Sequence, residues 1–135
     1  FHDMETFIST NKLTHNVSLL GNKSRSYIYE HLADYDLFVQ PSRFEGFGLT
    51  VVEAMAAFVP VLVSKNEGPL EIIEKGKYGY CFRNGDAKDC ANMIEHILKN
   101  YPTSDFLIKS YNHAKEIYDV KNTALKYLDF YKSNI

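Results

Sequence analysis

The chain has 135 residues and 45% of them are apolar, so it can bury a core of its own without metal ions or disulfides. Its 15 lysines and arginines against 17 aspartates and glutamates give a net charge of −2, which lacks the basic excess of a nucleic-acid-binding protein. Cys81 and Cys90 have no CxxC or Cys/His ligand spacing, and apolar stretches such as residues 58–63 are far shorter than the roughly 20 residues that cross a bilayer. We therefore expect reduced thiols, no metal site and no membrane span.

Along the chain, short β-rich runs alternate with runs of helical period, a pattern typical of an α/β fold. A first helix is predicted over 3–11, followed by a strand at 17–20, a helix over 25–33 and a strand at 37–40. Next come a helix over 48–58, a strand at 61–64, a helix over 69–75 and a strand at 80–82. Helices over 86–100, 104–118 and 121–132 close the chain.

Local signals support the ends of these elements. Ser24 and Asp86 precede apolar-periodic runs as helix N-caps, and Pro69 suits the first turn of a helix. The strands are short and nearly continuous in apolar residues, as in a parallel sheet covered by helices on both faces. We predict a single domain over residues 1–135, and because it opens on a helix we interpret it as a fragment that lacks its first strand.

The segment that carries chemistry runs from Pro41 to Ala56, between a predicted strand and a predicted helix. Open α/β sheets bind ligands at this position, beyond the carboxyl ends of their strands. Gly46 and Gly48 allow the backbone to approach a ligand and to adopt positive φ, and the N-terminus of the following helix favours an anion such as phosphate. Glu53 lies about 8 Å along the helix from Gly48, where its carboxylate can accept hydrogen bonds from sugar hydroxyls.

Each of these features also has a structural interpretation. A Gly-x-Gly pair is common in tight strand-to-helix turns, and a glutamate in an early helical turn is often a surface residue that the helix dipole favours. The combination is more specific than its parts. Glu53 is followed by the small apolar run 54–57, which predicts a largely buried helix, and a buried carboxylate needs a partner.

At this point the sequence resembles a known family. The run RFEGFGLTVVEAMA from Arg43 to Ala56 resembles the E-x7-E signature of the retaining glycosyltransferases of the glycogen-synthase and sucrose-synthase type, called family 4 or glycosyl transferases group 1. The stretches LLG at 19–21, ADYDLFVQPS at 33–42, GPLEII at 68–73 and NGD at 84–86 are similar to the segments that surround the signature in that family. The resemblance covers about residues 17 to 100.

The resemblance implies a Rossmann-like parallel sheet with flanking helices, the C-terminal half of a two-domain GT-B fold, with extra C-terminal helices. It implies that Glu45, the expected catalytic residue, contacts hydroxyls of the transferred sugar and that Glu53 binds the ribose of the donor. The other donor-binding residues that it implies are Gly46, Phe47, Gly48, Leu49 and Thr50 over the sugar and the diphosphate, and Gly21 and Lys23 facing the base.

The reaction that the resemblance implies is transfer of a hexosyl unit from a nucleotide-diphosphate sugar, UDP-sugar being favoured, to a saccharide or lipid-linked acceptor with retention of configuration, in polysaccharide biosynthesis. No cofactor, metal or nucleic acid is implied. The acceptor, and any contact with the inner face of the membrane, would belong to a missing N-terminal domain of a cytoplasmic enzyme. The basic pair that usually neutralises the diphosphate would be missing too, so the chain alone is expected to bind donor weakly and to be inactive.

Two other functions remain open. A nucleotide-sugar epimerase on a related GT-B scaffold would carry its catalytic carboxylates and a histidine elsewhere, and a non-catalytic nucleotide-binding module would bind nucleotide as tightly as nucleotide-sugar. Arg43, Lys65 and Glu71 are weaker candidates for donor contacts, since each has a solvated or dipole-favoured alternative. The 5 histidines fall outside the motif and are predicted to be surface or packing residues.

Overall fold

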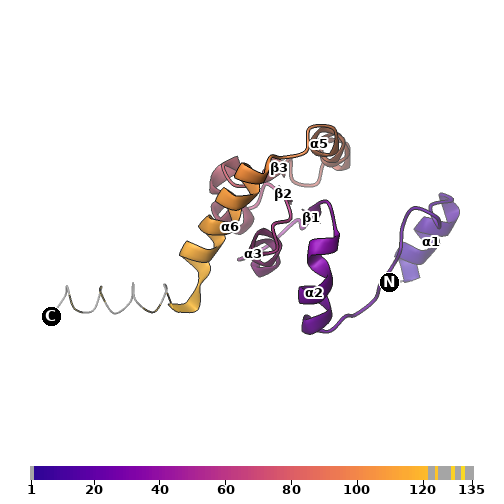
Figure 1. Ribbon diagram of the computed structural model, residues 1–135. Coiled ribbons are helices and arrows are strands. Elements are labelled where there is room, and N and C mark those ends of the chain that lie inside the picture. The colour runs from indigo at the N-terminus through magenta and orange to yellow at the C-terminus, as the bar shows by residue number, and fades with distance from the viewer. Residues whose placement is uncertain (1, 122–123, 125–128, 130–131, 133–135) are drawn as a thin grey trace.

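A computed structural model describes residues 2–121, 124, 129 and 132 (Figure 1). Its centre is a three-stranded parallel sheet in the order β1-β2-β3, formed by β1 (Phe38–Gln40), β2 (Val61–Ser64) and β3 (Tyr80–Phe82). In this register Phe38 lies beside Val61, and Leu62 lies beside Tyr80. The strands predicted at 37–40, 61–64 and 80–82 are confirmed, each within one residue.

Helices precede and follow the strands in the order that the sequence predicts. They are α1 (His2–Thr10), α2 (Arg25–His31), α3 (Leu49–Ala56), α4 (Glu67–Ile72), α5 (Ala87–Lys99) and α6 (Ser104–Tyr118), with short 3-10 turns η1 (Leu32–Asp34) and η2 (Glu74–Gly76). The hydroxyl of Ser24 and the carboxylate of Asp86 accept backbone N–H groups as N-caps of α2 and α5. Most of the helix predicted over 121–132 lies outside the described residues.

The sheet carries a packed layer on each face. β2 is buried along its whole length, and its side chains alternate between the two faces. On one face Val63 joins a cluster from α3, α4 and α6 in which Met55 is fully buried. On the other face Leu62 packs with Ile97 of α5. Burial on both faces explains why β2 reads as a continuous apolar run rather than an alternating one.

α6 lies across α3 and the α4 region and fixes them to one another. The Ser110 hydroxyl donates to the Tyr78 carbonyl at 3.0 Å, and Nε2–H of His113 donates to the Ile72 carbonyl at 2.9 Å. Tyr111 stacks on Phe58 with the ring centroids 4.4 Å apart. His113 is 6% exposed, so the prediction that it is a packing residue is confirmed.

Residues 17–20 do not form a strand, which corrects one prediction. Val17 and Leu20 are 40% and 48% exposed, and the Val17 N–H donates to the Leu13 carbonyl. A strand needs a neighbour with which to exchange backbone hydrogen bonds. Within residues 2–121 the three-stranded sheet places no strand beside this segment, so its backbone stays irregular.

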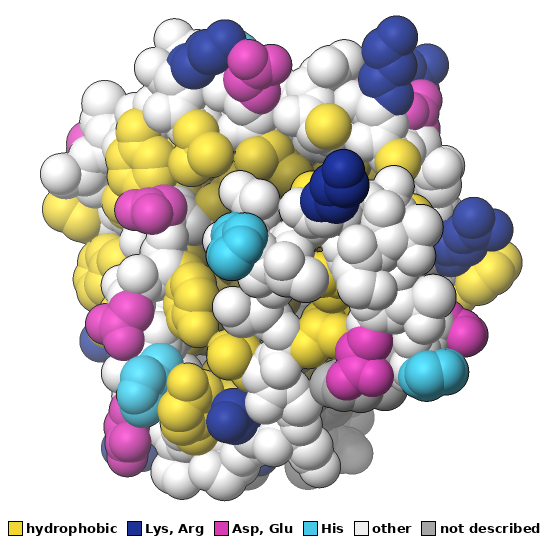
Figure 2. All heavy atoms as spheres, turned by 90° about the vertical axis from the view of Figure 1, so that its right-hand side faces the viewer, with side chains coloured by type: hydrophobic (Ala, Val, Ile, Leu, Met, Phe, Trp, Pro, Cys, Tyr) yellow, Lys and Arg dark blue, Asp and Glu magenta, His cyan; other side chains and the backbone are white. Residues whose placement is uncertain are grey.

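The side of the molecule that carries α1 and α2 exposes many hydrophobic side chains (Figure 2). α1 stands apart from the sheet (Figure 1), with Met4 and Phe7 of its apolar face exposed. Between α2 and β1 lies a hollow of about 490 Å³, whose lining includes Leu20, Ile28 and Val39. None of the described helices is long and apolar enough to cross a membrane.

Candidate functional site

The site begins where β1 ends, in the loop of residues 41–48 that connects β1 to α3. The carbonyl of Ser42 accepts hydrogen bonds from the Ser64 hydroxyl and the Asn66 side-chain amide. The Asn84 amide donates to the Arg43 carbonyl and to Oδ1 of Asn66, both at 2.9 Å. These residues follow or end β1, β2 and β3, so the loop is fixed to the carboxyl edge of the sheet.

Two glycines give the loop its shape. Gly48 has φ 85°, a left-handed conformation that favours glycine, and it is the N-cap of α3. Gly68 at the start of α4 lies against the loop so closely that a Cβ there would be 2.3 Å from the Gly46 carbonyl oxygen. Gly46 itself does not have a positive φ, which corrects that part of the prediction, and a Cβ on it would meet nothing within 4 Å. The backbone at Gly46 is therefore open to a ligand.

The N-terminus of α3 is directed at this loop. The first N–H groups of an α-helix have no intrahelical partner, and Gly48 has no side chain with which to cap them. Leu49 and Thr50, the first two residues of α3, are exposed. A helix N-terminus therefore follows the loop, and anion binding at it stays a prediction.

Glu45 lies half-buried in the loop and has a partner in the sheet. The side-chain amide Nε2 of Gln40, the last residue of β1, donates to Oε2 of Glu45 at 2.8 Å. The sequence singled out Glu45 but not Gln40. A polar residue inside an apolar strand, five residues before the glutamate, is the signal that was available.

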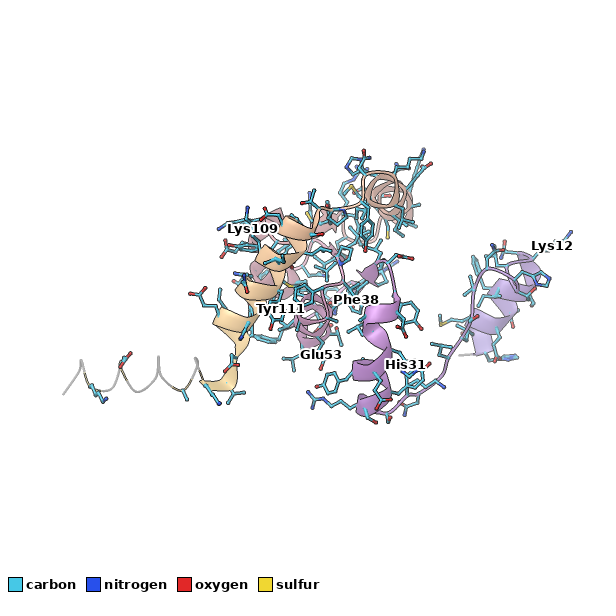
Figure 3. All side chains as sticks on the ribbon, viewed as in Figure 1. Lys12, His31, Phe38, Glu53, Lys109 and Tyr111 are labelled. Atoms are coloured by element: carbon cyan, nitrogen blue, oxygen red, sulfur yellow. The ribbon has the colours of Figure 1, made fainter. Side chains whose placement is uncertain are left out.

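Glu53 projects from α3 toward α2 (Figure 3), and its side chain is 22% exposed. Its Oε1 is 3.4 Å from the Tyr29 hydroxyl and 3.5 Å from Nη2 of Arg25, while Nε of Arg25 donates to the Tyr29 hydroxyl at 2.6 Å. The Tyr29 hydroxyl and the charge of Glu53 raise the pKa of Arg25, so its guanidinium remains a fixed positive charge. The carboxylate thus has the partners that its position in a buried helix requires.

Gly21 and Lys23 lie in the turn that precedes α2. Gly21 has φ 68°, the Lys23 ammonium lies 4.9 Å from the centre of the Tyr27 ring, and both residues line the hollow beside β1. The turn leads directly into Arg25, which contacts Glu53. The structure therefore connects the predicted base-facing turn to the predicted ribose-binding carboxylate.

Apolar side chains form the outer rim of the loop. Phe44 is 94% exposed, and Leu49 is 61% exposed. Phe47 is half-exposed and meets Tyr118 of α6 edge-on, with the ring centroids 5.7 Å apart. The sequence analysis expects Phe47 and Leu49 near the sugar and the diphosphate. It does not predict the contact of Phe47 with Tyr118, because the two residues lie far apart in the sequence.

The weaker candidates lie at the edge of this arrangement. Arg43 and Lys65 are exposed. The pKa of Asp89 is lowered mainly by the hydrogen bond from the Arg83 backbone N–H, and the positive charge of Lys65 lowers it further. Burial raises the pKa of Tyr118, and the negative charge of Glu71 raises it further. No group of three or more metal-ligating side chains occurs among residues 2–121, 124, 129 and 132.

Comparison with known proteins gives consistent matches. A family model described as glycosyl transferases group 1 matches residues 1–115. A sucrose synthase of Denitrovibrio acetiphilus is 42% identical over 82 residues, which are 59% of this chain and 10% of that protein. The sulfoquinovosyl transferase SQD2 of Arabidopsis thaliana is 34% identical over 97 residues, 70% of this chain and 19% of that protein.

Solved structures agree in fold over nearly the whole chain. Sucrose-phosphate synthase from Thermosynechococcus elongatus matches with a TM-score of 0.85 and 25% identity, covering 98% of this chain and 33% of that one. Anabaena HepE in complex with UDP matches with a TM-score of 0.86 and 25% identity, covering 98% of this chain and 36% of that one. The expected Rossmann-like parallel sheet of a GT-B protein is confirmed, and the chain spans only about a third of these structures.

Proposed function

The chain belongs to the glycosyl transferases group 1 family, and we propose that it is the domain that binds the nucleotide-sugar donor of a retaining hexosyltransferase. The observation that carries the proposal is the loop 41–48 at the carboxyl edge of a parallel sheet, followed by α3, with Glu45 and Glu53 on either side of the helix N-terminus. In this proposal residues 1–135 form one domain, and the acceptor binds to a separate domain of a longer protein.

In this proposal the diphosphate of the donor binds at the N-terminus of α3. The uncapped N–H groups there and the positive end of the helix dipole both favour a phosphate. Gly46 leaves room for the ligand to approach the backbone, since a Cβ on it would meet no atom within 4 Å. When the bond between the anomeric carbon and the phosphate oxygen breaks, the same groups stabilise the negative charge of the departing nucleotide diphosphate.

The two carboxylates contact different parts of the donor. Glu53, held by Arg25 and Tyr29, accepts hydrogen bonds from the ribose hydroxyls, and the turn of Gly21 and Lys23 faces the base. Glu45, on the loop, accepts hydrogen bonds from hydroxyls of the hexosyl unit. A saccharide or lipid-linked acceptor supplies the hydroxyl oxygen that forms the new bond to the anomeric carbon, and the proton of that hydroxyl passes to an oxygen of the departing nucleotide diphosphate.

UDP is the nucleotide that we favour. The HepE structures that resemble this chain are complexes with UDP, with UDP and glucose, and with UDP-glucose. Each is 25% identical to this chain over 98% of its length, so the nucleotide is carried over as a proposal. Nothing in the loop itself selects among bases, because its contacts lie with the phosphates and sugars.

The test is titration of UDP into the isotopically labelled chain, followed by NMR. We expect the chemical-shift changes to centre on residues 46–50, with weaker changes at Glu53 and at the turn of Gly21 and Lys23. Changes confined to α6 would contradict the proposal. If UDP bound as tightly as every UDP-sugar and no hexosyl transfer occurred in the longer protein, a non-catalytic nucleotide-binding module would be favoured instead.

A further inference from the structure

A buried amide stands at the end of β1, in a position that packing alone would give to an apolar residue. Gln40 is 8% exposed and lies beside Val63 of β2. Phe38, two residues earlier and so on the same face of the strand, packs against the cluster formed by α3, α4 and α6. Gln40 is thus a polar side chain at the edge of the apolar core.

The hydrogen bonds of this amide are only half satisfied. Nε2 donates to Oε2 of Glu45 at 2.8 Å, whereas Oε1 is buried and has no partner among the described residues. A carboxylate can only accept, so the amide must present its N–H₂ side to Glu45 and leave its oxygen in the core. A buried acceptor without a donor costs free energy of folding, which an apolar side chain of the same size would not.

We propose that Gln40 is a positioning residue that holds Glu45 for the hexosyl unit of the donor. The inference rests on the proposed function. The loop around Glu45 is exposed at Phe44, Gly46 and Phe47, so a carboxylate on it has few other restraints. The bond from the Gln40 side-chain amide ties one oxygen of Glu45 to the end of β1 and leaves the other oxygen to accept from a sugar hydroxyl.

Such a role separates the effects on stability from the effects on binding. If the Gln40 amide serves to hold Glu45, replacing it with an apolar side chain should cost no folding stability, because the replacement also removes the unpaired Oε1 from the core. The same replacement frees Glu45 and lowers the affinity for the part of the ligand that Glu45 contacts. A residue that merely fills space would show the opposite pattern.

The variant that tests this is Gln40→Met, which keeps the length and approximate volume of the side chain but cannot donate to Glu45. The measurements are the thermal unfolding midpoint and the dissociation constants of UDP and UDP-glucose by calorimetry. We expect an unchanged or higher midpoint, an unchanged UDP constant, and a UDP-glucose constant raised about five- to tenfold, the size expected when a charged hydrogen bond is weakened.

Two further variants make the result specific. Val63→Ala, at the paired position on β2, should lower the midpoint while leaving the ratio of the two dissociation constants as it is. In the double variant Gln40→Met/Glu45→Gln, the ratio of the UDP-glucose and UDP dissociation constants should be the same as in Glu45→Gln alone, since both changes act through one carboxylate. Fully additive effects, or a lower midpoint with an unchanged ratio in Gln40→Met, would overturn the proposal.

The failure of this inference can be told from the failure of the proposed function. If the unmodified chain binds neither UDP nor UDP-glucose, the proposed function is wrong and the inference falls with it. If the unmodified chain binds both, and Gln40→Met binds both as well as the unmodified chain does, the donor site stands and only the role of Gln40 is refuted.

Discussion

Glu45 and Glu53 are separated by seven residues and are held by different parts of the fold. Glu53 contacts Arg25 and Tyr29 of α2, whereas Glu45 contacts Gln40 of β1. The Arg25 side chain is 75% exposed, so its ion pair with Glu53 contributes little to folding stability. Its importance in the proposed site is that it orients Glu53 away from the sheet and toward the turn that precedes α2.

Different partners lead to different expected effects of substitution. Glu53→Gln should weaken UDP and UDP-sugar equally, because both contain the ribose, by about 1.5–3 kcal/mol for a lost charge-assisted hydrogen bond. That corresponds to a roughly ten- to hundredfold rise in both dissociation constants. Calorimetric titration of each ligand into the variant measures the change.

Glu45→Gln is the matched control for that experiment. If Glu45 contacts only the hexosyl unit, the variant should bind UDP nearly as well as the unmodified chain. Loss of UDP binding as severe as in Glu53→Gln would show that Glu45 is a structural support of the loop, and the assignment of the two carboxylates would be wrong.

At the scale of the elements, the sequence predicts those whose signals are local. β1, β2 and β3 are apolar runs ended by turn residues, and α2 and α5 begin at Ser24 and Asp86 as predicted. The predicted strand at 17–20 fails because strand formation depends on a neighbour that local sequence does not reveal. α4 begins at Glu67, before the position of Pro69 that served as its predicted start.

In the candidate site, too, the features with local signals are predictable from the sequence and those that depend on distant contacts are not. The loop, the helix N-terminus and both glutamates follow from residues 41–56 alone. The Gln40 amide lies only five residues before Glu45, but the Asn66 and Asn84 contacts that fix the loop and the Arg25 pair join segments that are up to 41 residues apart in the chain. Residue spacing within one segment carries no information about such contacts, so they become visible only in the folded chain.

The contact between α4 and the loop gives a prediction about two glycines. Gly68→Ala should destabilise the fold by about 1–3 kcal/mol, because the new Cβ would clash with backbone atoms that cannot rotate away. The clash involves the Gly46 carbonyl oxygen, 2.3 Å from the added Cβ, and the loop must shift to relieve it. Chemical denaturation measures the loss of stability, and UDP affinity should fall with it.

Gly46→Ala is the control, since a Cβ on Gly46 would meet nothing within 4 Å. Its stability should change by less than about 0.5 kcal/mol, as for a surface substitution. Its affinity for UDP-sugar should nevertheless fall, because the methyl group occupies the space that the proposal gives to the donor. Equal destabilisation by both substitutions would contradict the close approach of α4 to the loop.

At the scale of the whole molecule, α6 connects the packing of the sheet to the rim of the site. It packs on α3 and holds the α4 region through His113, and near its end Tyr118 supports Phe47 of the loop. The site is therefore supported from below by the sheet and from one side by α6. Its outer side, which includes Phe44 and Leu49, faces solvent.

An outer side that faces solvent suits donor binding but not transfer. Transfer needs an acceptor hydroxyl held beside the anomeric carbon and a site from which water is excluded. With Phe44 at 94% and Leu49 at 61% exposure, no described residue closes the loop from the opposite side. We therefore expect the purified chain to bind UDP-sugar weakly and to transfer no hexosyl unit to any acceptor.

Mass spectrometry of the chain incubated with UDP-glucose and saccharide or lipid-linked acceptors checks this expectation. The matched sample is the longer protein under the same conditions, in which transfer should occur and should be lost in Glu45→Gln. Transfer by the chain alone would mean that the loop, the N-terminus of α3 and the two carboxylates suffice for the reaction. In that case the exposed rim of Phe44 and Leu49 would itself have to bind the acceptor.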